Sequence, residues 1–116
     1  MQRAAVERYY RYPMNLLGYD RLQTGNKEDA IELFKLNTEA YPPSANAQDS
    51  LSDGYLVAGK YDLALAAEEK CLELLPGDAS DPDFKAALWR QAEEKTARLK
   101  RLVGDARRTF QPAAGK

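Results

Sequence analysis

The sequence predicts an all-α fold in which antiparallel helix hairpins stack as a solenoid. Two similar hairpin units form its centre, an N-terminal helix precedes them and a long C-terminal helix caps them. Three observations predict this fold: residues that recur 34 positions apart, a glycine and a proline at matching places in each repeat, and a long amphipathic segment after the second repeat. With 116 residues the chain is one small domain, which can bury roughly 65% of its unfolded surface.

The first residues, 1–12, are predicted to form an N-terminal helix or a linker, because the pattern breaks at Tyr12 and Pro13. If they are a helix, four apolar and aromatic side chains are available to cover the outer side of the first unit. These are Ala5, Val6, Tyr9 and Tyr10. The alternative is that this segment is the last helix of a preceding domain.

Six pairs of identical residues define the repeat. Each pair is 34 positions apart without a gap: Leu17 and Leu51, Leu22 and Leu56, Gly25 and Gly59, Ala30 and Ala64, Glu39 and Glu73, Pro42 and Pro76. We call this spacing the repeat period. So many coincidences at one spacing are hard to obtain by chance. We therefore predict two copies of one unit, over residues 13–43 and 44–77.

Each copy is predicted to contain two helices joined by a tight turn. Gly25 and Gly59 lie where a first helix ends, and a left-handed glycine there lets the next helix run back antiparallel. Pro42 and Pro76 end the second helices, because proline has no N–H to donate and disfavours helical geometry in the residue before it. The buried stripes of the second helices are predicted at Ile31, Leu33, Phe34, Leu63, Leu65, Leu72 and Leu75.

A long capping helix is predicted over residues 80–103. Ser80 or Asp81 can cap its start, and Pro82 suits its first turn. Its buried stripe is predicted at Phe84, Leu88, Ala92, Leu99 and Leu102, with Trp89 at the packing edge. Residues 104–116 are predicted to be a disordered tail.

The repeat resembles the tetratricopeptide repeat (TPR) family, whose unit is a helix–turn–helix with the same repeat period. The first copy matches the family pattern with Leu17, Gly18, Ala30, Phe34 and Pro42, and the second with Leu51, Tyr55, Gly59, Tyr61, Ala64, Cys71 and Pro76. Four positions depart from the pattern: Arg21 replaces an aromatic residue, Asn37 a small residue, Ser52 a glycine and Glu68 a phenylalanine. The resemblance implies a stack of helix pairs with a concave groove.

Composition argues against an enzyme. The chain has no histidine, which removes the commonest general base and the commonest transition-metal ligand, and its single cysteine excludes an internal disulfide. We predict no catalytic, cofactor or metal site. The apolar runs are too short to span a membrane, and residues 1–15 show no signal-peptide pattern. The compartment is therefore unknown, and cytoplasmic only by default if the chain is complete.

Charge is divided unevenly along the chain. Residues 13–84 contain five Lys or Arg and fourteen Asp or Glu, whereas residues 85–116 contain nine and three. The basic C-terminal segment lacks the interleaved aromatic residues of a nucleic-acid site, so a solvated helix face explains it better. An acidic body with a basic end can steer a partner or favour head-to-tail association.

The TPR resemblance implies a protein-interaction module whose first helices line the groove. The predicted groove residues are Tyr12, Asn15, Leu16, Tyr19 and Gln23 in the first copy, and Asn46, Asp49, Ser50, Asp53 and Val57 in the second. A TPR subfamily grips C-terminal carboxylates with Lys, Arg and Asn at such positions, but here Asp49 and Asp53 would repel a carboxylate. We therefore expect a basic or neutral segment, from a partner protein, from the same polypeptide or from a second copy.

A broader resemblance concerns the stretch SANAQDSLSDGYLVAGKYDLALAAEEKCLELLPGD and the basic helix after it. Together they are similar to C-terminal TPR regions attached to bacterial hydrolase-type enzymes. This resemblance implies an accessory domain of a larger bacterial protein, without catalytic residues of its own. A structural domain that pairs copies of such a hydrolase is the alternative. Partners are then proteins or peptides, with no nucleic acid, membrane or metal.

Three features that suggest chemistry are better explained by structure. The run DASDPD over residues 78–83 lacks the glycine and terminal glutamate of an EF-hand loop, and a capped helix start explains it. Cys71 is interpreted as a packed thiol, because no histidine or helix N-terminus is near enough to form a thiolate. Asp49 and Asp53 lie four apart on one helical face, which fits a groove better than an acid pair.

Overall fold

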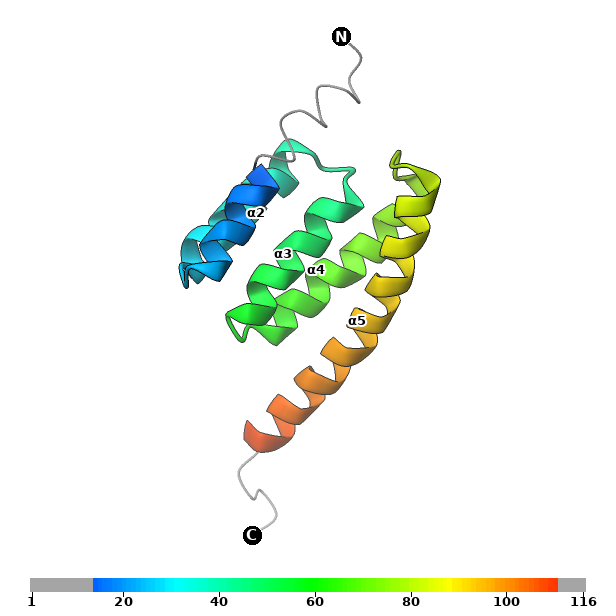
Figure 1. The fold of residues 1–116 in the computed structure, drawn as a ribbon. Helices are drawn as coiled ribbons and strands as arrows, with labels where there is room; N and C mark the ends of the chain where they lie inside the picture. Colours follow the sequence, from blue (N-terminus) through cyan, green and yellow to red (C-terminus); the bar gives the residue numbers. More distant parts are fainter. Residues whose placement is uncertain (1–13, 111–116) are drawn as a thin grey trace.

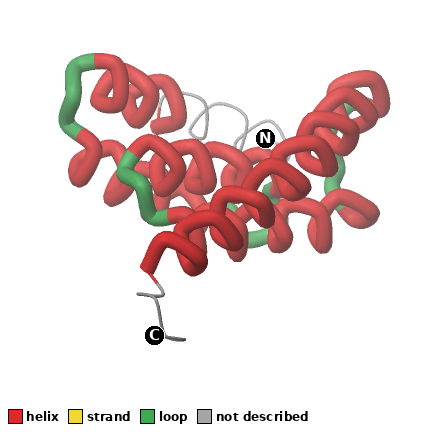
Figure 2. The backbone as a smooth tube through the Cα atoms, turned by 90° about the horizontal axis from the view of Figure 1, so that it is seen from below, coloured by secondary structure: helices red, strands yellow, loops and turns green. Residues whose placement is uncertain are grey.

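The computed structural model describes residues 14–110, all of whose regular structure is helical (Figure 1). A helix over residues 14–23, called helix 14–23 below, is followed by α2 (Lys27–Ala40), α3 (Ala45–Val57), α4 (Tyr61–Leu74), a 3-10 turn η1 (Leu75–Gly77) and α5 (Pro82–Phe110). Consecutive helices pack antiparallel and short loops join them (Figure 2). The predicted all-α fold with a long C-terminal helix is confirmed.

The helix boundaries repeat with the spacing found in the sequence. Helix α4 begins and ends one repeat period after α2, and α3 ends one repeat period after helix 14–23. The predicted segment of residues 1–12 and the end of the chain, residues 111–116, lie outside the described range.

The two predicted glycine turns have the same geometry. Gly25 has φ +86° and Gly59 has φ +75°, the left-handed region that favours glycine. In the first turn the N–H of Gly25 donates to the carbonyl of Leu22, and the N–H of Asn26 donates to the carbonyl of Arg21. The second turn makes both hydrogen bonds at the equivalent positions of the next unit. This paired pattern is a Schellman motif, which satisfies carbonyls that the helix end leaves free.

The first hairpin closes around Phe34, whose side chain is fully buried. A Cβ atom added to Gly18 would lie 2.4 Å from the Phe34 ring, and one added to Gly54 would lie 3.0 Å from it. The two glycines therefore form a slot for the ring. Tyr19 meets Phe34 edge-on, with ring centroids 5.0 Å apart.

A second apolar cluster seats α5 on the second hairpin. Leu88 and Ala92 of α5 pack with Cys71 of α4, with Leu75 of η1 and with Ala45 at the start of α3. The start of α5 is capped as predicted, because Asp81 Oδ2 accepts from the backbone N–H of Asp83 at 3.1 Å and of Phe84 at 3.4 Å.

Asp78, the first residue of the DASDPD run, ties the chain before α5 to α3. Its carboxylate accepts from the backbone N–H of Ala45 and of Ser80, each at 2.8 Å. Asp78 thus serves local structure, in line with the structural interpretation of this run.

Two predictions for α5 are wrong. The helix does not end at residue 103 but continues to Phe110, so residues 104–110 are not a disordered tail. Gly104 costs roughly 1 kcal/mol in a helix interior, but good helix formers follow it. The Arg108–Asp105 ion pair within the helix and the contact of Arg107 with Asp62 of α4, at 3.4 Å, also hold this end.

The second error concerns the buried stripe of α5. Phe84 is 42% exposed, whereas Val103 is buried in addition to Leu88, Ala92 and Leu99. Trp89, expected at the packing edge, is 36% exposed. Leu63, predicted in the stripe of α4, is also 48% exposed. None of the described helices is both long enough and apolar enough to cross a membrane.

Candidate functional site

The predicted groove residues separate into a buried group and an accessible group. Tyr12 lies outside the described range. Asn15 and Ser50 are buried, at 7% and 1% exposed, and Asn46, Tyr19, Asp49 and Asp53 are partly buried. Leu16 at 70%, Val57 at 49% and Gln23 are exposed. Because Asn15 and Ser50 are covered in the folded chain, their side chains serve the fold.

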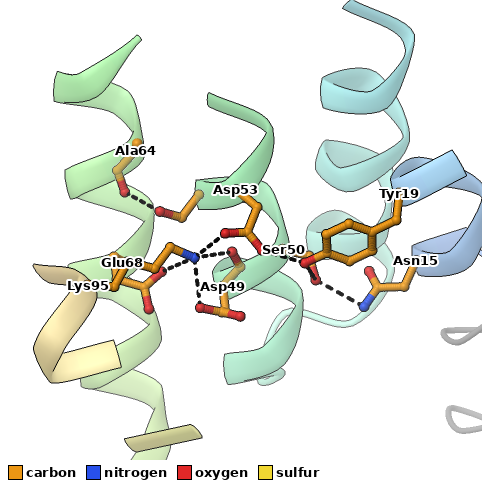
Figure 3. A network of polar contacts seen from close by, with 9 residues as sticks. Asn15, Tyr19, Asp49, Ser50, Asp53, Ala64, Glu68 and Lys95 are labelled. Carbon is orange, nitrogen blue, oxygen red and sulfur yellow. Dashed lines mark hydrogen bonds and ion pairs between the residues drawn. The ribbon is translucent and has the colours of Figure 1, made fainter. Parts of the chain in front are cut away.

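Apart from Asn46, the buried and partly buried residues belong to a polar network that begins between helix 14–23, α2 and α3. Asn37 of α2 donates to Asn15 Oδ1 at 2.8 Å, and Asn15 donates to Ser50 Oγ at 3.0 Å. The Tyr19 hydroxyl lies 2.6 Å from Asp53 Oδ2 and 3.2 Å from Ser50 Oγ (Figure 3). With one proton to give, it donates to the closer, charged Asp53 oxygen.

Lys95 of α5 continues this network into an ionic cluster. Its Nζ atom lies 3.0 Å from Asp49 Oδ1, 2.5 Å from Asp53 Oδ1 and 3.2 Å from Glu68 Oε1 (Figure 3). It also donates to the backbone carbonyl of Asp49 at 3.1 Å. We call Asp49, Asp53, Glu68 and Lys95 the Lys95 cluster. It joins α3, α4 and α5, and through Tyr19 it reaches helix 14–23.

The repeat explains why Glu68 is buried. It lies one repeat period after Phe34, and both side chains are fully inaccessible. Ser52 likewise occupies the position of Gly18 and donates its hydroxyl to the carbonyl of Ala64 at 2.8 Å. The second unit thus places a carboxyl group where the first places an aromatic ring, and α5 supplies the matching cation.

The environment raises the pKa of Glu68, Lys95 and Tyr19. Burial, the charge of Asp49 and a hydrogen bond to Asp49 raise the pKa of Glu68 to about 8, although Lys95 opposes them. Burial alone would lower the pKa of Lys95, but the three carboxyl groups outweigh it and raise that pKa. Burial and the charge of Asp53 raise the pKa of the Tyr19 hydroxyl.

Cys71 lies close to the carboxyl groups of the Lys95 cluster. Carboxylates and a thiolate are metal ligands, so the geometry of this site bears on metal binding. One ligand atom each from Asp49, Glu68 and Cys71 lie within 4.8 Å of one another. The Lys95 ammonium is already in contact with both carboxyl groups, so a cation holds this site. Burial and the charges of Glu68 and Asp49 raise the pKa of the Cys71 thiol, which disfavours the thiolate needed by a ligand or a nucleophile.

Of the sources expected for a basic group beside Asp49 and Asp53, the described structure supplies one from the same polypeptide: Lys95 engages both carboxylates. The sequence pattern places these two residues together but does not identify Lys95 and Glu68 as their neighbours. A signal was present: the repeat puts Glu68 at a buried position, and a buried carboxyl group requires a cation or a proton.

An open hollow of 390 Å³ lies elsewhere, between the start of α4 and the last turns of α5. Leu63, Val103 and Ala106 line it with the residues of the α3–α4 turn, and none of the predicted groove residues does. The hollow and the predicted groove are therefore separate surfaces.

No family model matches this sequence, and no curated protein matches it either.

Proposed function

We propose that the chain is a non-catalytic protein–protein interaction module of the tetratricopeptide type. Its partner is a peptide segment or a partner domain, and the module is an accessory domain of a larger bacterial protein. The contact surface is the accessible part of the predicted groove on helix 14–23 and α3.

The repeat in the helix boundaries is the observation that carries this proposal. Positions one repeat period apart have the same structural role: Gly25 and Gly59 turn the chain, and Ala30 and Ala64 are both fully buried. Such units stack side by side and create extended surfaces, which is how repeat proteins bind other proteins. The hydrolase context rests on sequence resemblance alone, since a fold does not specify a function.

The accessible groove residues indicate the chemistry of the partner. Leu16, Gln23 and Val57 are uncharged and exposed, whereas Asp49 and Asp53 are engaged by Lys95. A segment that buries apolar side chains and makes neutral hydrogen bonds fits this surface better than a strongly basic one. We therefore expect binding that depends little on salt.

Selection from a random peptide library displayed on phage tests the proposal with the purified chain as bait. We expect the double variant Gln23→Lys, Val57→Lys to bind the selected peptides at least about tenfold more weakly, a loss of about 1.4 kcal/mol. Ala66→Lys, at an exposed position of α4, is the matched control and should bind like the wild type. Equal affinity of the double variant and the control would contradict the proposed surface.

Self-assembly is the second candidate function, and exposed leucines favour it. Leu16 on helix 14–23 is 70% exposed and Leu36 on α2 is 52% exposed, both at the end of the stack opposite α5. Light scattering over a range of concentrations separates the candidates. A dimer at micromolar concentration that Leu16→Lys abolishes supports assembly, and a monomer throughout supports the peptide-binding module.

A further inference from the structure

Each of the protons of the Lys95 ammonium has an acceptor in the Lys95 cluster. An ammonium group has three N–H donors. Lys95 directs them to the backbone carbonyl of Asp49 at 3.1 Å, to Asp49 Oδ1 at 3.0 Å and to Asp53 Oδ1 at 2.5 Å. No donor is left for Glu68, whose contact with the Lys95 Nζ atom at 3.2 Å is an ion pair without a hydrogen bond.

Glu68 therefore lacks what a buried carboxylate requires. Its side chain is fully buried, and neither Oε1 nor Oε2 receives a hydrogen bond within the described part of the chain. An ionised carboxylate that is buried without hydrogen bonds is unfavourable in free energy, and a buried carboxyl group avoids this cost by staying protonated. Asp49 supplies an acceptor for that proton, since its carboxylate lies beside Glu68.

We propose that Glu68 keeps its proton in the folded protein at neutral pH and donates it to Asp49, so that the docking of α5 is coupled to the binding of one proton. With this proton the cluster holds two carboxylates, one neutral carboxyl group and one ammonium. Without it, three carboxylates share a single ammonium. This proton coupling involves only residues of the folded chain and does not depend on the identity of a partner.

The groups that face Glu68 come from three helices. Asp49 faces it from α3, Lys95 from α5, and Cys71 from its own helix, while Asp53 of α3 reaches it through Lys95. Tyr19 is one step further away, through its hydrogen bond to Asp53. The Cys71 thiol is neutral and Lys95 stays charged, because the pKa of each is raised. Of Glu68, Cys71 and Lys95, Glu68 is therefore the group whose charge changes between neutral and weakly alkaline pH.

The direction of the pH dependence follows from the raised pKa of Glu68. The folded state holds the proton up to about pH 8, whereas an unfolded glutamate releases it near its ordinary pKa of 4.5. The contribution to stability is complete below the unfolded pKa and is lost as the pH rises through the folded one. Undocking of α5 exposes Glu68 to water and removes the burial that raises its pKa, so deprotonation disfavours the docked α5 even though Lys95 itself attracts the charged form.

Urea unfolding across pH tests the coupling, with Glu68→Gln as the variant and Glu69→Gln as the control. Glutamine keeps the shape and can donate to Asp49 but does not titrate, and Glu69 is exposed on the same helix. Between about pH 5.5 and about pH 7.5, we expect the unfolding constant of the wild type to rise relative to Glu68→Gln by up to about tenfold per pH unit, the slope for one proton. The Glu69→Gln protein should parallel the wild type.

Reaction of Cys71 with a thiol reagent reports on α5 itself. Cys71 is the only cysteine, is fully buried and packs beneath Leu88 and Ala92 of α5. Relative to Glu68→Gln, the wild type should gain thiol reactivity as the pH is raised above about 8. Dividing each rate by that of the same protein unfolded in urea at the same pH removes the ordinary increase of thiolate with pH.

Two results would overturn the proposal. One is a pH slope of stability that is the same in the wild type and in Glu68→Gln. The other applies even if that variant does not fold: carboxyl ¹³C NMR of the wild type in which every glutamate titrates near pH 4.5, the ordinary glutamate value. One glutamate carboxyl that stays protonated at about pH 7 is the expected result.

Discussion

Replacing Lys95 with methionine is expected to destabilise the protein by about 3–5 kcal/mol. Methionine approximates the length of the lysine stem and removes the ammonium that contacts Asp49, Asp53 and Glu68. The side chain of Lys95 is only 16% exposed and that of Asp49 only 17%, so water cannot easily replace the lost cation. Carboxylates left without a counter-ion account for most of the expected loss.

Urea unfolding at neutral pH measures this effect. Lys70→Met is the matched control, because Lys70 pairs with Glu73 at the surface with side chains 48% and 70% exposed. Exposed pairs of this kind contribute about 0–1 kcal/mol. Adding Asp49→Asn and Asp53→Asn to Lys95→Met should recover part of the lost stability, since the uncompensated charges are then removed. A loss below about 1 kcal/mol for Lys95→Met would show that the cluster is not a structural anchor.

Replacing Phe34 with alanine is expected to cost about 3–5 kcal/mol, comparable with the loss of Lys95. The ring is fully buried in the slot between Gly18 and Gly54, and its edge-on contact with Tyr19 adds to the packing. Alanine leaves a cavity that the two helices cannot close without moving. Chemical unfolding measures the loss, and Leu36→Ala, at a position 52% exposed on the same helix, is the control.

A substitution of Gly18 tests the same packing of the Phe34 ring. Gly18→Ala places a methyl group 2.4 Å from the Phe34 ring and should destabilise by about 1–3 kcal/mol through overpacking. In the Phe34→Ala background the same methyl group meets open space, so the cost of Gly18→Ala should fall or reverse. Additive effects of the two substitutions would contradict the proposed slot.

The fold was predictable where local chemistry decides the structure. Gly25 and Gly59 turn the chain because a left-handed residue is required there, and the repeat period carries the helix boundaries from one unit to the next. The end of α5 was not predictable in this way. Gly104 resembles a helix stop, but the helix continues because the following residues are good helix formers and Arg107 contacts α4.

The site was less predictable than the fold, because its partners come from distant parts of the chain. Asp49 and Asp53 were placed on one helical face correctly, but the sequence does not state which cation they meet. Lys95 lies 46 and 42 residues away from them. Phe84 fits the periodicity of a buried stripe, yet only tertiary packing decides which edge of the stripe remains exposed.

The Lys95 cluster determines both which groove residues remain accessible to a partner and whether Glu68 keeps its proton. It neutralises the acidic part of the predicted groove, which leaves Leu16, Gln23 and Val57 as the accessible contact residues. It also uses all three ammonium protons on α3, which leaves Glu68 to keep its own. The proton proposal and the expected uncharged chemistry of the partner therefore both depend on the ammonium of Lys95 being held inside the fold.

The most direct test is ¹H–¹⁵N NMR of the lysine side-chain ammonium groups at neutral pH. We expect one ammonium signal whose protons exchange slowly with water, absent in Lys95→Met and retained in Lys70→Met, because three hydrogen bonds and burial protect it. Fast exchange for every lysine, as for an exposed amine, would show that Lys95 does not bind the carboxyl groups and would contradict both the proton proposal and the expected uncharged chemistry of the partner.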